Sequence, residues 1–472
     1  MKKSRLIIET IKLFTLIILY YIVGSKSIFL YVLSLSLYNI FTSCFNHITL
    51  SNTLKKLSSI QNKQKMYQYT LLTISIISLL FLLLGICISD IINILLNINN
   101  ILPVFIMMGL SIITKPLVKL TTEYIESINY NKKYSIFENI YYILDNLLLL
   151  IVAIFTFRVF KVNINVAVSL LYLSKIISAI IVIVLLYLTN NQKHKLNQPI
   201  EKINYQKEIK KILVKDSYKS LTSIIKNCYY YISIIILYLV LSTRYEYATA
   251  LIEKNISFIY LYAMGIINYI IYIIDSFNKT LPNNISINSK IYNNFKIMLP
   301  LTIIFSVISP LSCKIIFNNP NYSIYLSMVN FMAIFILLYD LTYENIINKK
   351  IMHITLFSGI ITKALLIIPL INSFYRMGYN LVYGDIISTI IGMFLSVIIN
   401  YIYLKKVNKT KENYFEKVLD ILYNNILLTI ILILLQFIIQ VDPESYFKSI
   451  GISIIYIVIS IAFLSLKKKR RG

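Results

Sequence analysis

Fourteen stretches of about twenty apolar residues, separated by short polar segments, constrain this chain more than any other feature. Each is near the ~20 residues that a helix needs to cross a hydrocarbon core of about 30 Å. Because that core offers no water to the backbone, only helices and closed barrels can span it. Runs such as 147–154 and 426–435 lack the alternation of a barrel strand. The sequence therefore predicts an all-α, polytopic membrane protein.

The predicted spans follow one another closely along the chain. They cover residues 8–24, 28–46, 69–89, 101–121, 136–157, 165–188, 218–241, 252–275, 295–317, 323–342, 351–371, 382–403, 420–440 and 447–466. With the N-terminus placed inside, the cytoplasmic segments hold 34 of the 46 Lys and Arg residues, and the outer loops hold 8. Basic residues favour the cytoplasmic side of a bilayer, so this division predicts that both termini lie inside.

The most charged segment, 189–218, separates six predicted spans from the eight that follow. Transporters are often built from two such repeats, related by an axis along the membrane normal. Spans four and ten support this division, because the segments Glu123–Lys133 and Tyr343–Lys350 both pass from a carboxylate-bearing helix end to Asn-Lys-Lys. The predicted domains are an N-terminal six-helix bundle with a cytoplasmic linker (1–216), a second six-helix bundle (217–406), and two further helices with a basic tail (407–472).

The net charge of +26 does not indicate a nucleic-acid partner, because the lysines lie beside apolar spans rather than in one basic domain. Cations next to a span are attracted to the anionic phospholipids of the inner leaflet. The tail Lys467–Arg471 is the clearest example. We therefore expect anionic phospholipids, and no nucleic acid, at the cytoplasmic face.

The sequence contains few features of a soluble catalytic or nucleotide-binding site. All four cysteines lie within predicted spans, and His47, His194 and His353 share no spacing that suits a metal. The glycine-rich loop that cradles nucleotide phosphates is absent. We therefore predict no catalytic residues, no metal and no cofactor, in a monomer driven by an ion gradient, the membrane potential or the flow of its substrate.

Three segments in the second half resemble a signature of bacterial lipid-linked oligosaccharide flippases: Asp340–Ile351, Leu356–Pro369 and Tyr383–Gly392. In that signature a QG-x-GK-x-K turn precedes a helix with a mid-span lysine, and the run G-A-A-I-A-T follows. Lys363 matches the lysine, and Gly384–Thr389 matches the run. The chain is thus similar to the multidrug/oligosaccharidyl-lipid/polysaccharide flippase superfamily, in the branch of stage V sporulation protein B and the lipid II flippases.

The resemblance implies a central cavity between two six-span bundles that opens alternately to either side. Basic residues on spans one, two and eight would receive the substrate pyrophosphate there, and spans 13 and 14 would supply a groove for the lipid tail. This chain departs from that plan, since span two, Ile28–Asn46, has no cation and span eight, Leu251–Asp275, has only Lys254.

Ionisable residues within predicted spans are the candidate site residues. Such a group costs at least ~2.5–3.5 kcal/mol in the bilayer, so it needs a partner or a wet cavity. Lys226, with Lys219 seven residues earlier on the same helical face, is predicted to attract a phosphate. The alternative is that Lys226 pairs with an acid such as Asp145.

Other polar residues carry similar alternatives. Lys12 could bind substrate in place of the first-span arginine that the resemblance implies, or pair with Glu9. The substrate-binding candidates are Lys12, Asn39, Asn46, His47, Lys219 and Lys226, of which the three on span two could equally reflect ordinary packing. The candidate coupling or structural charges are Asp145, Lys175, Asp340, Glu344 and Lys363.

These inferences predict a transporter of the bacterial plasma membrane that flips a polyprenyl-pyrophosphate-linked sugar to the outer leaflet. One alternative is a cation-coupled drug antiporter on the same fold, in which Asp145 exchanges a cation for a proton. The other is a membrane polymerase or ligase of lipid-linked sugars, for which Asp442 and Glu444 would be the external acids.

Overall fold

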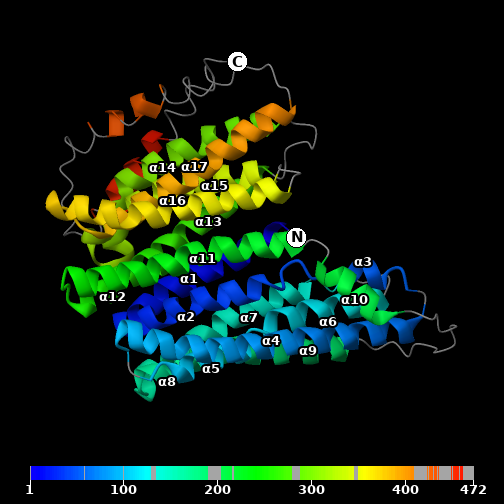
Figure 1. Ribbon diagram of the computed structural model, residues 1–472. Coiled ribbons are helices and arrows are strands. Elements are labelled where there is room, and N and C mark those ends of the chain that lie inside the picture. Colours follow the sequence, from blue (N-terminus) through cyan, green and yellow to red (C-terminus); the bar gives the residue numbers. More distant parts are fainter. Residues whose placement is uncertain are drawn as a thin grey trace. The chain divides into compact units, whose positions relative to one another are not determined.

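A computed structural model describes residues 2–57, 59–98, 100–128, 134, 136–189, 204–214, 217–278, 287–344 and 349–408, together with short pieces of 423–460. Throughout these residues the regular structure is helical, and none of them forms a strand (Figure 1). The chain forms two compact units, residues 1–257 and 258–472. The predicted domain boundaries at 216 and 406 remain a prediction.

Unit 1 contains the elements of the first seven predicted spans and the start of the eighth. They are α1 (Lys2–Ile22), α2 (Ser25–Ser43), α3 (Ser51–Leu54), α4 (Ile60–Leu96), α5 (Leu102–Ser111), α6 (Thr114–Ile128), α7 (Ile136–Ala153), η1 (Ile154–Val159), α8 (Ile164–Leu171), α9 (Leu173–Thr189), α10 (Tyr205–Val214), α11 (Ser217–Leu239), η2 (Val240–Arg244) and α12 (Thr249–Ser257).

Unit 2 contains the remaining elements. They are η3 (Phe258–Ala263), α13 (Met264–Asn278), α14 (Ile287–Phe317), η4 (Pro320–Tyr322), α15 (Ser323–Glu344), α16 (Lys349–Arg376) and α17 (Val382–Asn408). Within the described pieces of the last two predicted spans, Leu428, Leu432 and Tyr456 pack against the apolar face of α14.

Each of the first twelve predicted spans coincides with one or more of these helices. Ten helical stretches in the described part of the chain are long and apolar enough to cross a membrane. The helices α1 and α2 are not among the ten. Charges such as Glu9 and Lys12 interrupt α1, whereas serines and Asn39 dilute α2. The membrane class is therefore confirmed, and the full number of fourteen spans remains a prediction.

The helix α2 tolerates polar side chains because it lies in the interior of unit 1. It packs against α5, α8, α11 and α12, and most of its side chains are buried. The hydroxyl of Ser34, fully buried, donates to the Leu30 carbonyl of its own helix at 2.8 Å. Because neighbouring helices rather than lipid surround it, α2 needs fewer apolar residues than a helix that faces lipid.

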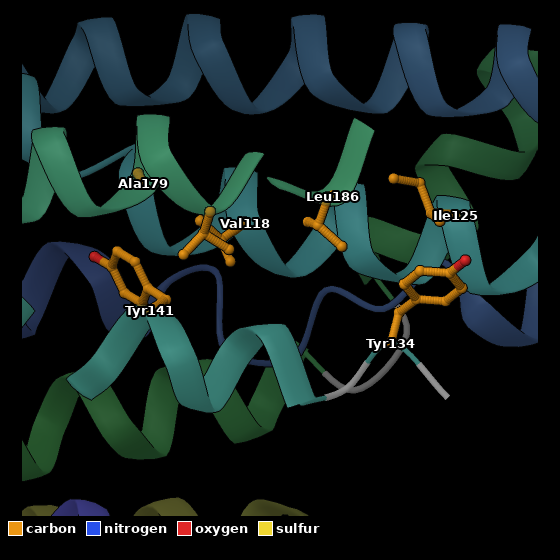
Figure 2. Packing of buried hydrophobic residues seen from close by; sticks show 7 residues of the cluster. Val118, Ile125, Tyr134, Tyr141, Ala179 and Leu186 are labelled. Atoms are coloured by element: carbon orange, nitrogen blue, oxygen red, sulfur yellow. The ribbon is translucent and has the colours of Figure 1, made fainter. Parts of the chain in front are cut away.

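The fourth span is one helical rod with a break. The helix α5 ends at Ser111 and α6 begins at Thr114, with Pro116 in its first turn. A proline has no N–H to donate, and its ring clashes with the carbonyl four residues earlier, here that of Ile112. Beyond the break, Val118 and Ile125 of α6 pack with α7 and α9 in an apolar cluster that Tyr141 and Tyr134 close at its two ends (Figure 2).

Candidate functional site

A stripe of charged side chains runs along α6, because Lys115, Lys119 and Glu123 recur every four residues. Residue 115 is the midpoint of the membrane-crossing stretch Leu102–Ile128. At 1.5 Å per residue it lies about 20 Å from either end of that stretch. Lys115 therefore lies in the middle of this helical stretch, inside the fourth predicted span, and its side chain is only partly buried.

The Lys115 ammonium has no hydrogen bond or ion pair within the described part of the chain. Of the charges around it, Lys119, Lys175 and Lys12 act on it most strongly, and Glu138 acts less. An ionised group at this depth is stable only beside water or a counter-charge. The interior of unit 1 at Lys115 is thus suited to an anion that comes from outside the protein.

The other two members of the stripe are bonded to the backbone of segment 46–51, which connects α2 to α3. The Lys119 ammonium donates to the carbonyls of Asn46 at 3.3 Å and Ile48 at 2.7 Å. Glu123 Oε2 accepts from the backbone N–H groups of Leu50 at 2.5 Å and Ser51 at 3.2 Å. These bonds hold α6 against the segment between α2 and α3 and leave Lys115 as the member of the stripe without a partner of its own.

A buried ion pair lies deeper in unit 1. Asp145 of α7 accepts from Lys175 Nζ and from Ser174 Oγ of α9, each at 2.7 Å. The Lys175 ammonium also lies 5.2 Å from the centre of the Tyr38 ring. Both carboxylate oxygens of Asp145 are therefore occupied by α9. Lys175, which the next span supplies, is thus a partner of Asp145, whereas the side chain of Lys226, the predicted alternative partner, lies outside the described part of the structure.

The inner ends of α2 and α11 are joined by polar side chains. Ser43 accepts from Asn227 at 2.7 Å and from Ser223 at 3.1 Å. His47 bonds to the Leu213 carbonyl at 2.9 Å and also contacts the Ser220 hydroxyl. Asn46 reaches Ser223 at 3.5 Å. This seam, defined as Ser43, Asn46 and His47 with their α11 partners, fastens span two to span seven.

The predicted substrate-binding residues fall into three groups. Asn46 and His47 belong to the seam, whereas the side chain of Asn39 is exposed. Lys12 lies 3.9 Å from Glu9, as the i,i+3 spacing predicts, and about half of its side chain is exposed. Lys219 and Lys226 belong to α11, but their side chains lie outside the described part of the structure.

Unit 2 contains a second buried ion pair. Lys363 of α16 lies 3.3 Å from Asp385 of α17, and the two side chains are 5% and 1% exposed. The Tyr260 hydroxyl of η3 donates to the other oxygen of Asp385. Asp385 was not among the predicted site residues. A signal was present, because Asp385 stands where the flippase run G-A-A-I-A-T has alanine.

Close packing of α16 on α17 positions this pair. A Cβ on Gly384 would lie 2.6 Å from the backbone nitrogen of Ile371, and one on Gly359 would lie 2.3 Å from Ser396 Oγ. Both glycines thus let the two helices approach. Thr389, the last residue of the matched run, donates to the Asp385 carbonyl at 2.8 Å.

The remaining predicted residues lie at the ends of helices or beyond the described residues. Asp340 is partly buried in the last two turns of α15. The side chain of Glu344, and both Asp442 and Glu444, fall outside what the structure describes. Among the described side chains no three His, Cys, Asp or Glu residues group as metal ligands would.

Lys115 is the functional candidate that sequence reasoning missed. The charge count groups Lys115 and Lys119 with the cytoplasmic segment after span four, although both lie within the predicted span 101–121. The structure places them on the α6 stripe inside unit 1. Their position inside a predicted span was the available signal.

No family model and no curated protein sequence matches the chain. Among solved structures, it is similar to lipid II flippase MurJ in an inward closed conformation, with 14% identity, a TM-score of 0.67, and coverage of 99% of this chain and 98% of the other. It is also similar to an inward-facing multidrug resistance MATE family transporter of the MOP superfamily, with 12% identity, a TM-score of 0.56, and coverage of 86% and 96%.

A third similar structure is a MOP superfamily transporter from Pyrococcus furiosus described as having a binding pocket of reverse polarity. It shares 9% identity and a TM-score of 0.52, with coverage of 87% of this chain and 96% of the other.

The fold and the buried charges define a class: a polytopic helical membrane protein that keeps lysine–carboxylate pairs and a lone lysine within its helical units. The likeness to solved structures then shows that this chain shares the polytopic helical fold of a lipid II flippase and of MATE transporters. The fold that the resemblance of Lys363 and Gly384–Thr389 implies is thus confirmed.

Proposed function

We propose that this protein is a transporter that flips a polyprenyl-pyrophosphate-linked sugar from the inner to the outer leaflet of a bacterial plasma membrane. One observation carries the proposal: Lys115 lies within the fourth membrane-spanning stretch without a partner in the described part of the chain, among other cations. A pyrophosphate supplies the counter-charge that this position calls for. The lipid tail can stay in hydrocarbon while the charged headgroup passes Lys115.

Lysine suits this role because its ammonium is a mobile point charge with three donors. Lys119 and Lys12 add positive potential at Lys115, although bonds to carbonyls and to Glu9 hold them locally. Lys219 and Lys226 of α11 belong to the same proposal as a second phosphate contact. Likeness to the lipid II flippase over 99% of this chain supports a lipid-linked cargo.

The test is to measure flipping of a fluorescent polyprenyl-pyrophosphate sugar in proteoliposomes. A charge-assisted hydrogen bond is worth about 1.5–3 kcal/mol, so Lys115→Ala should slow flipping by roughly 10- to 100-fold. Lys115→Arg keeps the charge and should retain most of the rate. Lys210→Ala, an exposed lysine on the cytoplasmic helix α10, is the matched control and should flip at the wild-type rate.

Several outcomes count against the proposal. Wild-type flipping by Lys115→Ala would remove the central phosphate contact. Wild-type rates in both Lys226→Ala and Lys12→Ala would remove the second phosphate contact and the contribution of Lys12 to the positive potential. A uniform loss of rate in all variants, Lys210→Ala included, would indicate damage to folding instead of a specific site.

The drug antiporter is the second candidate, because one of the similar structures is a multidrug resistance MATE family transporter. It needs a carboxylate that is free to exchange a cation for a proton. Asp145, the residue predicted for that exchange, is bound by Lys175 and Ser174. Efflux of a cationic dye that Asp145→Asn abolishes, with no flipping of lipid, would favour the antiporter.

A further inference from the structure

A cavity of about 520 Å³ lies within unit 1, away from Lys115. It is formed by the first turn of α2, the end of α4, the segment 162–165, the end of α11 and the helix α12. All of these lie at helix ends that the charge count predicts to face outside. Binding cavities for small molecules span about 300–1,000 Å³, so this one can hold a ligand of the size of a dipeptide.

Glu253 of α12 is the feature that gives this cavity its chemistry. Its side chain lines the cavity and is 7% exposed. Its carboxylate has no hydrogen bond and no ion pair among the described residues. A carboxylate that faces a cavity without a partner from the protein favours the binding of a cation there.

Lys26, at the start of α2, lines the same cavity and is the charge that acts on Glu253. The two do not approach within the 4 Å of an ion pair, so the cavity presents one positive and one negative group to a ligand between them. The carboxamides of Asn97, Asn163 and Asn165 add donors and acceptors to the lining. The Tyr238 ring, stacked 5.1 Å from Phe29, forms a rigid wall.

Separated opposite charges, carboxamides and an aromatic wall are together suited to a small molecule that carries both charges itself. We propose that this cavity binds a small zwitterionic ligand, with its ammonium group at Glu253 and its carboxylate at Lys26. Such a ligand could be free in the outer medium or be carried on a transported headgroup. The chemistry recognised is the same in both cases. The proposal does not depend on Lys115 or on lipid flipping.

The test uses the purified full-length protein in lipid nanodiscs and isothermal titration with L-alanyl-L-alanine. The N-acetyl derivative lacks the ammonium and the C-terminal amide lacks the carboxylate, so both should bind at least tenfold more weakly. Glu253→Gln should abolish dipeptide binding. Lys26→Met should weaken the dipeptide at least tenfold without weakening the amide further. Lys115→Ala should bind the dipeptide as the wild type does.

The melting temperature without ligand keeps this test independent of folding. Because Glu253→Gln removes an unpaired buried charge, it should melt at or above the wild-type temperature. A lower melting temperature would mean that Glu253 has a structural partner, and it would overturn the proposal. Equal dipeptide binding by wild type and Glu253→Gln would overturn it too, as would binding of Na⁺ alone that Glu253→Gln removes.

Two further titrations separate the sources of the ligand. Competition between the dipeptide and a lipid-linked sugar that carries both a free amine and a carboxylate would place the ligand on the headgroup. Dipeptide binding that such a lipid leaves unchanged would assign a ligand free in the outer medium. Both results support the site.

Discussion

At the scale of single residues, the triad of Lys363, Asp385 and Tyr260 shows how this chain keeps charges inside a membrane. Each charge alone would cost several kcal/mol, and together they form an ion pair at 3.3 Å, with a tyrosine hydroxyl bonded to the second oxygen. The sequence names Lys363 as a candidate coupling or structural charge, and the structure places it beside Asp385. Its partner was not predicted, because nothing in a sequence states which residue of the next span faces a given lysine.

This triad predicts an asymmetry between single and double substitutions. Lys363→Met or Asp385→Ala alone leaves a buried charge without its partner, and each should lower the free energy of unfolding by about 3–5 kcal/mol. The double variant Lys363→Met/Asp385→Leu removes both charges and should recover most of that loss. Equilibrium unfolding in mixed micelles measures all three. Additive losses in the double variant would show that the two groups do not stabilise each other.

At the scale of elements, the positions of the first twelve helices could be predicted from hydropathy alone, because lipid demands about twenty apolar residues per crossing. The breaks within them could not. Pro116 is a visible cause of the break between α5 and α6, but the break at Tyr172 between α8 and α9 has no proline. The seam of Asn46 and His47 also depends on how α11 packs on α2, which hydropathy does not encode.

The close contact between α16 and α17 predicts that a single added methyl group at this contact lowers the stability of the protein. Gly359→Ala would put a Cβ 2.3 Å from Ser396 Oγ and 2.8 Å from the Gly392 carbonyl, so the helices must separate. Overpacking of this kind costs about 1–3 kcal/mol. A melting curve in detergent should therefore shift to lower temperature.

Gly24→Ala is the matched control for this change, because nothing lies within 4 Å of its Cβ and its φ of −70° suits any residue. It should melt as the wild type does. Equal melting of Gly359→Ala and Gly24→Ala would mean that α16 and α17 do not approach as closely as described.

At the scale of the whole molecule, the two buried ion pairs occupy equivalent places in the predicted repeats. Asp145 and Lys175 join spans five and six, whereas Lys363 and Asp385 join spans eleven and twelve with the signs exchanged. This correspondence supports the repeat of six spans that the Asn-Lys-Lys turns suggested. Span ten, the counterpart of span four in this repeat, contains no lysine, so Lys115 has no equivalent there, which fits a binding role.

Every functional proposal here depends on which side of the membrane each loop faces, and the charge count predicts that side. Cysteine substitution tests it in a chain whose four native cysteines are replaced by serine or alanine. Met377→Cys lies in the turn between α16 and α17, is 63% exposed in the native residue, and should react with a membrane-impermeant maleimide on intact cells. Lys210→Cys, exposed on α10, should react only after the membrane is permeabilised.

The physical reason for this expectation is the crowding of lysines on one side, which favours that side being the cytoplasmic one. If Lys210→Cys reacted from outside and Met377→Cys only after permeabilisation, the orientation of the chain in the membrane would be the reverse of the predicted one. The Glu253 cavity would then open to the cytoplasm, and a zwitterion from the outer medium could not reach it. Reaction of both cysteines from outside would instead mean that the number of spans between residues 210 and 377 is even, contrary to the five that lie between them in the predicted arrangement.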